Sequence, residues 1–94
     1  MTTLSLLSSS DIQLSLSDWV KHQRKLCKYS RDELSKKSTV PTSTIRRFET
    51  TGQISLRQFL LLWQCVDNLD RINNLTKPNT TKSAPASIED VLSQ

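Results

Sequence analysis

The sequence predicts an all-α domain made of five helices. Its 94 residues include a single glycine, which argues against tight β-hairpins because their turns need residues that tolerate a positive φ. Between residues 17 and 76, apolar side chains recur at helical spacing, and residues that cap helices stand in front of several of these runs. A chain of this length forms one small domain, so the five helices should share one core.

Both ends of the chain are more polar than its middle, so we expect residues 17–76 to form the folded domain. Hydrophobic residues make up 35% of the chain, a low content that is typical of a compact centre with polar tails. Residues 1–16, rich in serine and leucine, should form a flexible arm. A folded part of about 60 residues is near the lower limit for folding alone, which favours a dimer or a partner.

The first helix should begin within "SLSDWV", where Ser15 or Ser17 can cap it and Asp18 adds negative charge to the first turn. The following "KHQRKLCK" contains no residue that breaks a helix. Helical spacing predicts a buried face made of Trp19, Val20, Gln23, Leu26 and Cys27. The opposite face is basic, with Lys21, Arg24, Lys25 and Lys28.

The second helix has the clearest start signal in the chain. Ser30 is followed three residues later by Glu33, a capping box that predicts a helix beginning at about Arg31. This helix is short, and Leu34 is its main inward anchor. "STV" then separates it from the next helix.

The third helix is predicted from "PTSTIRRFE". Pro41 suits the first helical position, because the amide hydrogen that proline lacks would be unpaired there anyway. The helix should run through Glu49 and end at Gly52. Ile45 and Phe48 would be buried, which leaves hydroxyl and guanidinium groups on the outer face.

"ISLRQFLLLWQCVDNL" predicts the strongest helix, with Ser55 as its cap. Its apolar stripe consists of Leu56, Phe59, Leu60, Trp63 and Val66. Leu61 and Leu62 widen the stripe, as either a dimer interface or a fully buried central helix would require. "LDRINNL" is a short fifth helix or a strand-like end. Residues 77–94 begin as a proline-containing linker and end in "SIEDVLSQ", either a frayed tail or a peptide that orders against a partner.

The charge distribution indicates a binding partner that is a polyanion. Residues 17–57 contain ten lysines and arginines against four acids, a net charge of +6. The rest of the chain carries three bases and five acids. A basic middle between slightly acidic ends favours a polyanion-binding patch over general solubilising charge, although a solvated basic face is the alternative.

Several functional classes lack support in the sequence. Cys27 and Cys65 are far apart, and neither they nor His22 have the spacing of metal ligands. No nucleophile with a base, glycine-rich phosphate loop or carboxylate pair is apparent, so we expect no enzyme activity and no cofactor. The N-terminus lacks the basic start of a signal peptide, and no apolar run is long enough to span a membrane. These features predict a reduced, cytoplasmic protein.

Residues 30–49 follow the plan of a helix-turn-helix: a capped short helix, a turn of three to four residues and a second short helix. Ser35 supplies the small side chain needed where the two helices cross, and Val40 would fill the turn. The outward residues of the second helix suit DNA recognition, because arginine can pair with guanine and hydroxyl-bearing side chains contact phosphates or thymine. These residues are Thr42, Ser43, Arg46 and Arg47.

"SRDELSKKSTVPTSTIRRFE" resembles the helix-turn-helix of the phage-repressor and Cro-like (XRE) family of DNA-binding proteins. The positions that fall on the family's pattern are Glu33, Leu34, Ser38, Val40, Thr44, Ile45, Phe48 and Glu49. From about Trp19 to Leu75 the chain is most similar to the HipB-type antitoxins. Lys28 and Thr39 stand where the family often has glycine, and a positive φ at either would cost on the order of 1 kcal/mol.

The resemblance implies a five-helix, lambda-repressor-like fold and a set of DNA contacts. Thr42, Ser43, Arg46 and Arg47 match base-reading positions of the family. Arg24 and Arg31 match phosphate-contacting positions, and Thr44 would add a further contact to the DNA backbone. A salt bridge from Arg46 or Arg47 to Glu49 or to another acid is the alternative for one of the two arginines.

The resemblance also implies a function. We expect a homodimeric transcriptional repressor that binds a palindromic operator in double-stranded DNA and acts as antitoxin and autoregulator of a HipBA-like toxin–antitoxin operon. Such a protein would be bacterial and associated with the nucleoid when bound. The alternative is an interaction protein whose main role is to hold a toxin, a HipA-like kinase encoded nearby, through residues 77–94 or the leucine-rich N-terminus.

Overall fold

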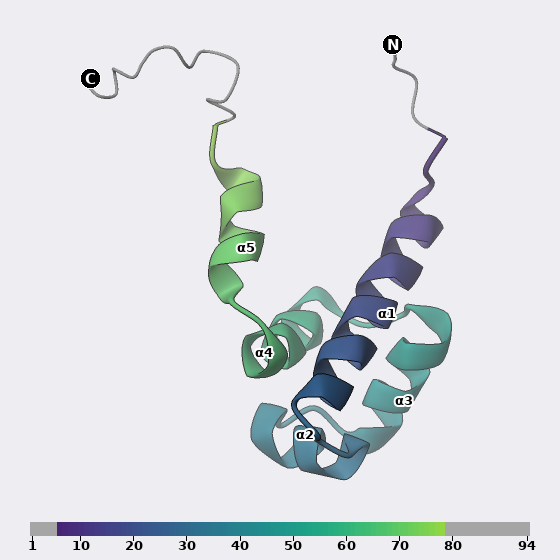
Figure 1. The fold of residues 1–94 in the computed structure, drawn as a ribbon. Helices are drawn as coiled ribbons and strands as arrows, with labels where there is room; N and C mark the ends of the chain where they lie inside the picture. Colours follow the sequence, from purple (N-terminus) through teal and green to yellow (C-terminus); the bar gives the residue numbers. More distant parts are fainter. Residues whose placement is uncertain (1–5, 79–94) are drawn as a thin grey trace, which may run out of the picture.

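A computed structural model describes residues 6–78, and within this range every regular element is a helix (Figure 1). The elements are α1 (Ser9–Leu26), α2 (Arg31–Ser38), α3 (Thr42–Thr51), α4 (Leu56–Val66), α5 (Leu69–Asn73) and the 3-10 helix η1 (Asn74–Thr76). The prediction of an all-α domain with five helices is therefore confirmed. The expectations for residues 1–5 and 79–94 lie outside the described residues.

α1 begins at Ser9, well before the predicted start, for which Ser15 or Ser17 was the expected cap. Ser8 caps it: the Ser8 Oγ accepts a hydrogen bond from the Asp11 N–H at 3.1 Å, and Asp11 Oδ2 accepts one from the Ser8 N–H at 3.0 Å. This reciprocal box satisfies two amides that would otherwise be unpaired at the helix start. Residues 9–16, expected in a flexible arm, are therefore helical.

The buried face of α1 also differs from the predicted one. Ser17, Val20 and Arg24 are its buried residues, whereas Leu26 and Cys27 are exposed. The spacing of apolar side chains alone places Arg24 on the solvent-facing side. Arg24 is buried because an ion pair to another helix offsets the cost of removing its charge from water.

The ends of α2 and α3 agree closely with the sequence signals. The capping box at the start of α2 is present, with Ser30 N–H donating to Glu33 Oε1 at 2.8 Å and Glu33 N–H donating to Ser30 Oγ at 3.0 Å. Gly52 ends α3 with φ of 79°. Pro41 is the N-cap residue rather than the first helical one, and its carbonyl accepts the Ile45 N–H at 3.0 Å.

Two residues other than glycine adopt the left-handed conformation. Lys28 follows α1 with φ of 62°, and Thr39 ends α2 with φ of 67°. For residues with a Cβ atom this conformation costs roughly 1–2 kcal/mol, because Cβ approaches the following carbonyl oxygen. The cost anticipated for these positions is therefore present in both turns.

The four helices α1, α2, α3 and α4 share one hydrophobic core. Its buried apolar side chains are Val20, Leu34, Val40, Ile45, Phe48, Phe59, Leu62, Trp63 and Val66. α4 supplies four of them, and the rings of Phe48 and Phe59 meet edge to face at 5.9 Å. Leu62 is fully buried, whereas Leu56, predicted in the buried stripe, is 71% exposed. One side of α4 is therefore buried in the centre of the core, whereas its other side leaves Leu56 exposed to solvent.

Polar contacts around Asp67 attach α5 to the core. The Asp67 carboxylate accepts hydrogen bonds from the Trp19 indole and from Arg71, each at 2.7 Å. The Arg71 guanidinium also lies 5.2 Å from the Trp19 ring and 5.6 Å from the Trp63 ring. In Figure 1, α5 and the first half of α1 extend from the same side of the core as two arms.

Candidate nucleic-acid interface

α3 is seated by one face and presents the other to solvent. Ile45 and Phe48 are fully buried, and they hold the helix against the rest of the core. Of the residues predicted to read bases, Ser43, Arg46 and Arg47 are exposed and Thr42 is half-buried. Thr44, predicted to touch the DNA backbone, is also half-buried. These five residues lie within the first six residues of α3.

Thr42 is held by a neighbour on α2. Its Oγ1 donates a hydrogen bond to Asp32 Oδ1 at 2.9 Å. This contact fixes the side chain of the first α3 residue and places a carboxylate beside the start of that helix. The hydroxyl proton of Thr42 is thereby used within the protein, so its hydroxyl oxygen can serve a ligand only as an acceptor.

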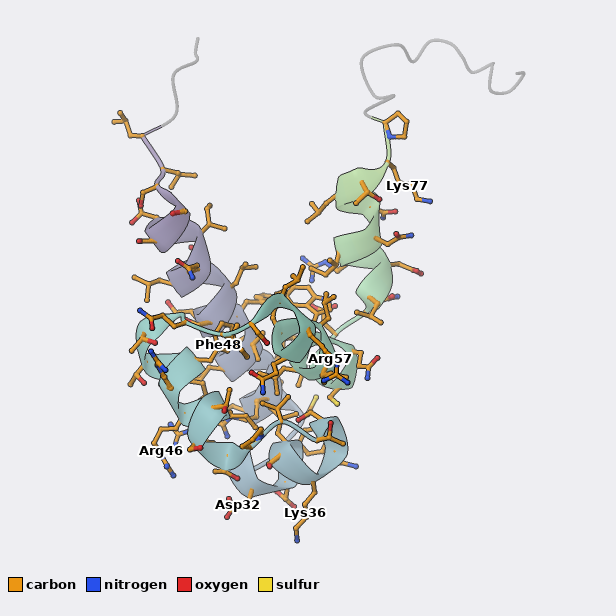
Figure 2. The ribbon with its side chains drawn as sticks, turned by 180° about the vertical axis from the view of Figure 1, so that it is seen from behind. Asp32, Lys36, Arg46, Phe48, Arg57 and Lys77 are labelled. Atoms are coloured by element: carbon orange, nitrogen blue, oxygen red, sulfur yellow. The ribbon has the colours of Figure 1, made fainter. Side chains whose placement is uncertain are left out.

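The two adjacent arginines of α3 differ in their surroundings. Arg47 donates a hydrogen bond from a terminal guanidinium nitrogen to Gln53 Oε1 at 2.6 Å. Within residues 6–78, the Arg46 side chain has no hydrogen-bond or ion-pair partner, and it points away from the fold (Figure 2). Among the described residues, neither arginine forms an ion pair with Glu49 or with another acid. Arg46 is the more available of the two.

Glu49 instead pairs with two other arginines. Its carboxylate accepts hydrogen bonds from Arg24 at 2.7 and 3.2 Å and from Arg31 Nε at 2.9 Å. Arg24 also donates to the Tyr29 carbonyl at 2.8 Å, and its side chain is only 8% exposed. The structure therefore makes Arg24 a buried link between α1 and α3, which is at odds with the expected phosphate contact.

Arg31 remains accessible from outside. Its side chain is 35% exposed, and the ion pair to Glu49 uses only Nε. A guanidinium group carries five N–H donors, so further donors can serve a ligand while Nε is held. Arg31 thus combines a fixed position with an exposed edge, as a contact to an anion requires.

The α2–α3 end of the molecule is predominantly basic. Lys36, Lys37, Arg46 and Arg47 are all exposed, and Figure 2 shows Lys36, Arg46 and Asp32 at this end. Some of the acidic residues at this end are held by hydrogen bonds or ion pairs within the protein. The Ser30 N–H and hydroxyl hydrogen-bond to Glu33 and hold the pKa of that carboxyl below its usual range. Glu49 is buried between its arginine partners.

Three residues near this surface were not predicted from the sequence. Asp32 and Gln53 hold Thr42 and Arg47 through contacts across turns, which no periodic pattern indicates. Thr50 is exposed on α3, and its hydroxyl donates to the carbonyl of Arg46 at 2.6 Å. Its position one turn after Arg46 could have identified it as part of the outer face.

The described part of the chain gives little support for a metal site or a membrane span. Residues 6–78 contain no group of three or more His, Cys, Asp or Glu side chains that could hold a metal ion. Cys27 and Cys65 are free thiols, and burial raises the pKa of the Cys65 thiol while Lys37 acts in the opposite direction. None of the helices within residues 6–78 combines the length and the hydropathy of a membrane span.

Comparisons of the chain with protein-family models, with curated proteins and with solved structures found no match.

Proposed function

We propose that α2 and α3 form a helix-turn-helix and that α3 is the recognition helix of a sequence-specific DNA-binding protein. The observation that carries the proposal is the outer face of α3. It presents hydroxyl groups and two exposed arginines on a helix whose inner face is fixed by Ile45 and Phe48. An α-helix fits the major groove of B-DNA, and arginine can read guanine there through two acceptors at once.

Arg46 is the proposed base reader. Its guanidinium group has no partner within residues 6–78 and can form a two-point contact with guanine O6 and N7. A hydrogen bond to Gln53 holds the Arg47 side chain, and this position favours a contact to phosphate at the edge of the groove. Ser43 lies one turn before the two arginines on the outer face. The Thr42 methyl group suits contact with a thymine methyl.

Phosphate contacts would come from Arg31 and from the start of α3. Pro41, the N-cap residue of α3, makes no side-chain cap, and within residues 6–78 no side chain accepts a hydrogen bond from the first amides of this helix. Backbone amides at a helix N-terminus attract phosphate groups, and Thr44 can add its hydroxyl. Arg24 would act indirectly, because it shares Glu49 with Arg31 and so helps to hold Arg31 in place.

The proposed protein acts as a homodimer on a near-palindromic operator. Two copies related by a two-fold axis would place two α3 helices in successive major grooves, about 34 Å apart. The resemblance of the sequence to HipB-type antitoxins supports the further proposal of a repressor and antitoxin that autoregulates a toxin–antitoxin operon.

Fluorescence anisotropy with the protein's own promoter tests the proposal. We expect specific binding, and we expect Arg46→Ala to cost about 1–3 kcal/mol and to relax the preference at particular base pairs. Lys77→Ala is the matched control, since Lys77 lies far from Arg46 (Figure 2) and loses the same charge. Affinity for the promoter no better than for random DNA at moderate salt would refute sequence-specific binding.

Binding to a toxin kinase is the second candidate function. The exposed leucines at the start of the described chain favour it, since Leu6 and Leu7 are 90% and 66% exposed. Co-purification with the product of a neighbouring gene, with and without residues 77–94, separates the roles of the two ends. Equal binding by the truncated chain would leave no role for the C-terminal segment in holding the partner.

A further inference from the structure

We infer that Gln53 is a positioning residue that holds Arg47 away from the base edges and so limits the number of base pairs that α3 reads. The inference rests on the proposed function and deepens it, because it names a residue outside α3 that sets the specificity of the recognition helix. Gln53 lies two positions after the end of α3 and is exposed.

A closed set of hydrogen bonds surrounds Arg47. A terminal nitrogen of its guanidinium group donates to Gln53 Oε1 at 2.6 Å. The Gln53 N–H donates to Thr51 Oγ1 at 3.1 Å, and the Thr51 hydroxyl donates in turn to the Arg47 carbonyl at 2.7 Å. The set begins and ends on Arg47, so it ties both the side chain and the backbone of this residue to the end of α3.

The turn after α3 is itself fixed, which gives Gln53 a defined place. Gly52 ends the helix with φ of 79°, and its N–H donates to the Phe48 carbonyl at 2.8 Å. The Gly52 carbonyl accepts a hydrogen bond from the Gln13 amide at 3.3 Å. A Cβ atom at position 52 would lie 3.1 Å from Gln13, so α1 and the end of α3 approach each other closely here.

The chemistry of the contact fixes the orientation of the Gln53 amide. A guanidinium group can only donate hydrogen bonds, so the atom that meets Arg47 must be the amide oxygen. Within residues 6–78 the amide nitrogen of Gln53 has no hydrogen-bond partner. Its two N–H groups suit a phosphate oxygen beside the one that Arg47 contacts.

The contact draws the Arg47 side chain towards the end of α3. Long side chains on a helix normally lean towards its N-terminus, and residues near that end contact base edges in a helix-turn-helix. Gln53 lies six positions after Arg47, beyond the last residue of the helix, so its hydrogen bond favours the opposite direction. It also occupies one donor, whereas two-point pairing with guanine needs two parallel N–H groups.

Arg46 provides the internal comparison. It is adjacent to Arg47 and equally charged, yet within the described residues its side chain has no hydrogen-bond or ion-pair partner. Thr50, one turn later, donates only to backbone carbonyls. A hydrogen bond that involves a charged group favours one arrangement by a factor of roughly ten, which is enough to give two adjacent arginines different roles.

Nuclear magnetic relaxation of the arginine side chains tests the hold without DNA. We expect the Nε–H group of Arg47 to be more ordered than that of Arg46, and we expect Gln53→Met to lower its order to the Arg46 value. Gln53→Glu should keep the order, because a carboxylate also accepts from a guanidinium group. The Nε–H group of Arg31, which Glu49 holds at 2.9 Å, is the reference for a fixed side chain.

Selection from randomised DNA tests the effect on specificity. Gln53→Met should gain a preference of at least about fivefold at one further base pair of each half-site. Adding Arg47→Ala should remove this gain, because Arg47 makes the new contact. Gln53→Glu should bind all sequences more weakly but keep the wild-type base preferences. Gln64→Met is the matched control, since Gln64 is an exposed glutamine on α4, and it should leave the base preferences unchanged.

Two results would overturn the inference. The first is order at Arg47 that equals that of Arg46 in the wild type, or that Gln53→Met leaves unchanged. The second is a wild type that prefers its own promoter together with a Gln53→Met variant of the same base preferences, which leaves the proposed function standing. A wild type without preference for its promoter would instead refute the proposed function. The relaxation measurement, made without DNA, would still decide whether Gln53 positions Arg47.

Discussion

Glu49 on α3 and Arg24 on α1 form a buried two-point ion pair, with nitrogen–oxygen distances of 2.7 and 3.2 Å. Arg31 on α2 adds a third contact to the same carboxylate at 2.9 Å. One side chain thus connects the three helices that build the proposed DNA-binding end. The charges are almost completely removed from water, with side-chain exposures of 1% for Glu49 and 8% for Arg24.

Removing Glu49 should be strongly destabilising. Glu49→Gln leaves the buried Arg24 charge without its counter-charge, and we expect a loss of about 3–5 kcal/mol in the free energy of unfolding. Urea denaturation followed by circular dichroism measures this loss. The double variant Arg24→Met with Glu49→Leu removes both charges and should cost much less, because apolar side chains can replace a buried ion pair. A single variant that loses less than about 1 kcal/mol would contradict the role assigned to the pair.

Glycine at the end of α2 should stabilise the protein. Thr39 has φ of 67°, so Thr39→Gly relieves the clash of Cβ and we expect a gain of about 1 kcal/mol in the free energy of unfolding. The same change at Thr50, inside α3, is the control and should destabilise, because glycine is a poor helix residue. Equal effects at the two positions in urea titrations would show that the left-handed conformation carries no measurable strain.

Local signals predicted most helix boundaries. The Ser30 and Glu33 box, the Ser55 cap and the Gly52 terminator all act within one turn of the chain, and each was found where the sequence indicated it. The Ser8 and Asp11 box is equally local, yet the serine-rich stretch offers several possible caps, and local spacing does not distinguish Ser8 from Ser15 or Ser17. Competing local signals are thus what displaced the start of α1.

Contacts between distant residues were beyond the reach of the sequence patterns. Arg24 is buried because Glu49, 25 positions later, approaches it, and periodicity alone assigns an arginine to the outer face. The hold of Gln53 on Arg47 depends in the same way on the path of the chain after α3. Helical spacing could therefore identify the outer face of α3 but not which of its arginines is already engaged.

Acid should weaken the attachment of α5 through Asp67. Burial acts to raise the pKa of the Asp67 carboxyl, but hydrogen bonds from Trp19, Asn68 and Arg71 together hold that pKa below its ordinary value. A lowered pKa in the folded state means that the ionised form stabilises the fold above about pH 3.9, the ordinary value for aspartate. This contribution is then lost as the pH falls through the lower, folded-state pKa.

The comparison of the wild type with Asp67→Asn isolates this group from Glu33, whose pKa is also lowered. At neutral pH the wild type should be the more stable protein in urea titrations. The difference between the two proteins should shrink as the pH falls below about 4, while Trp19 and Trp63 fluorescence reports the release of α5. A stability difference that is constant from pH 7 to about pH 2 would contradict the assignment.

Asp32 should limit the affinity of the proposed interface for DNA in general. Its carboxylate holds the Thr42 hydroxyl at 2.9 Å beside the start of α3, where the proposed binding mode brings phosphate groups. Asp32→Asn keeps an acceptor for Thr42 but removes the negative charge, so we expect binding to random DNA to strengthen by about fivefold at low salt. The gain should fade as salt is raised, because ions screen the contact. Asp18→Asn is the control, since it makes the same charge change at an exposed site of α1. Equal gains from the two substitutions in anisotropy titrations would mean that only the net charge of the protein affects the affinity. They would contradict the proposed position of the DNA phosphates beside Asp32.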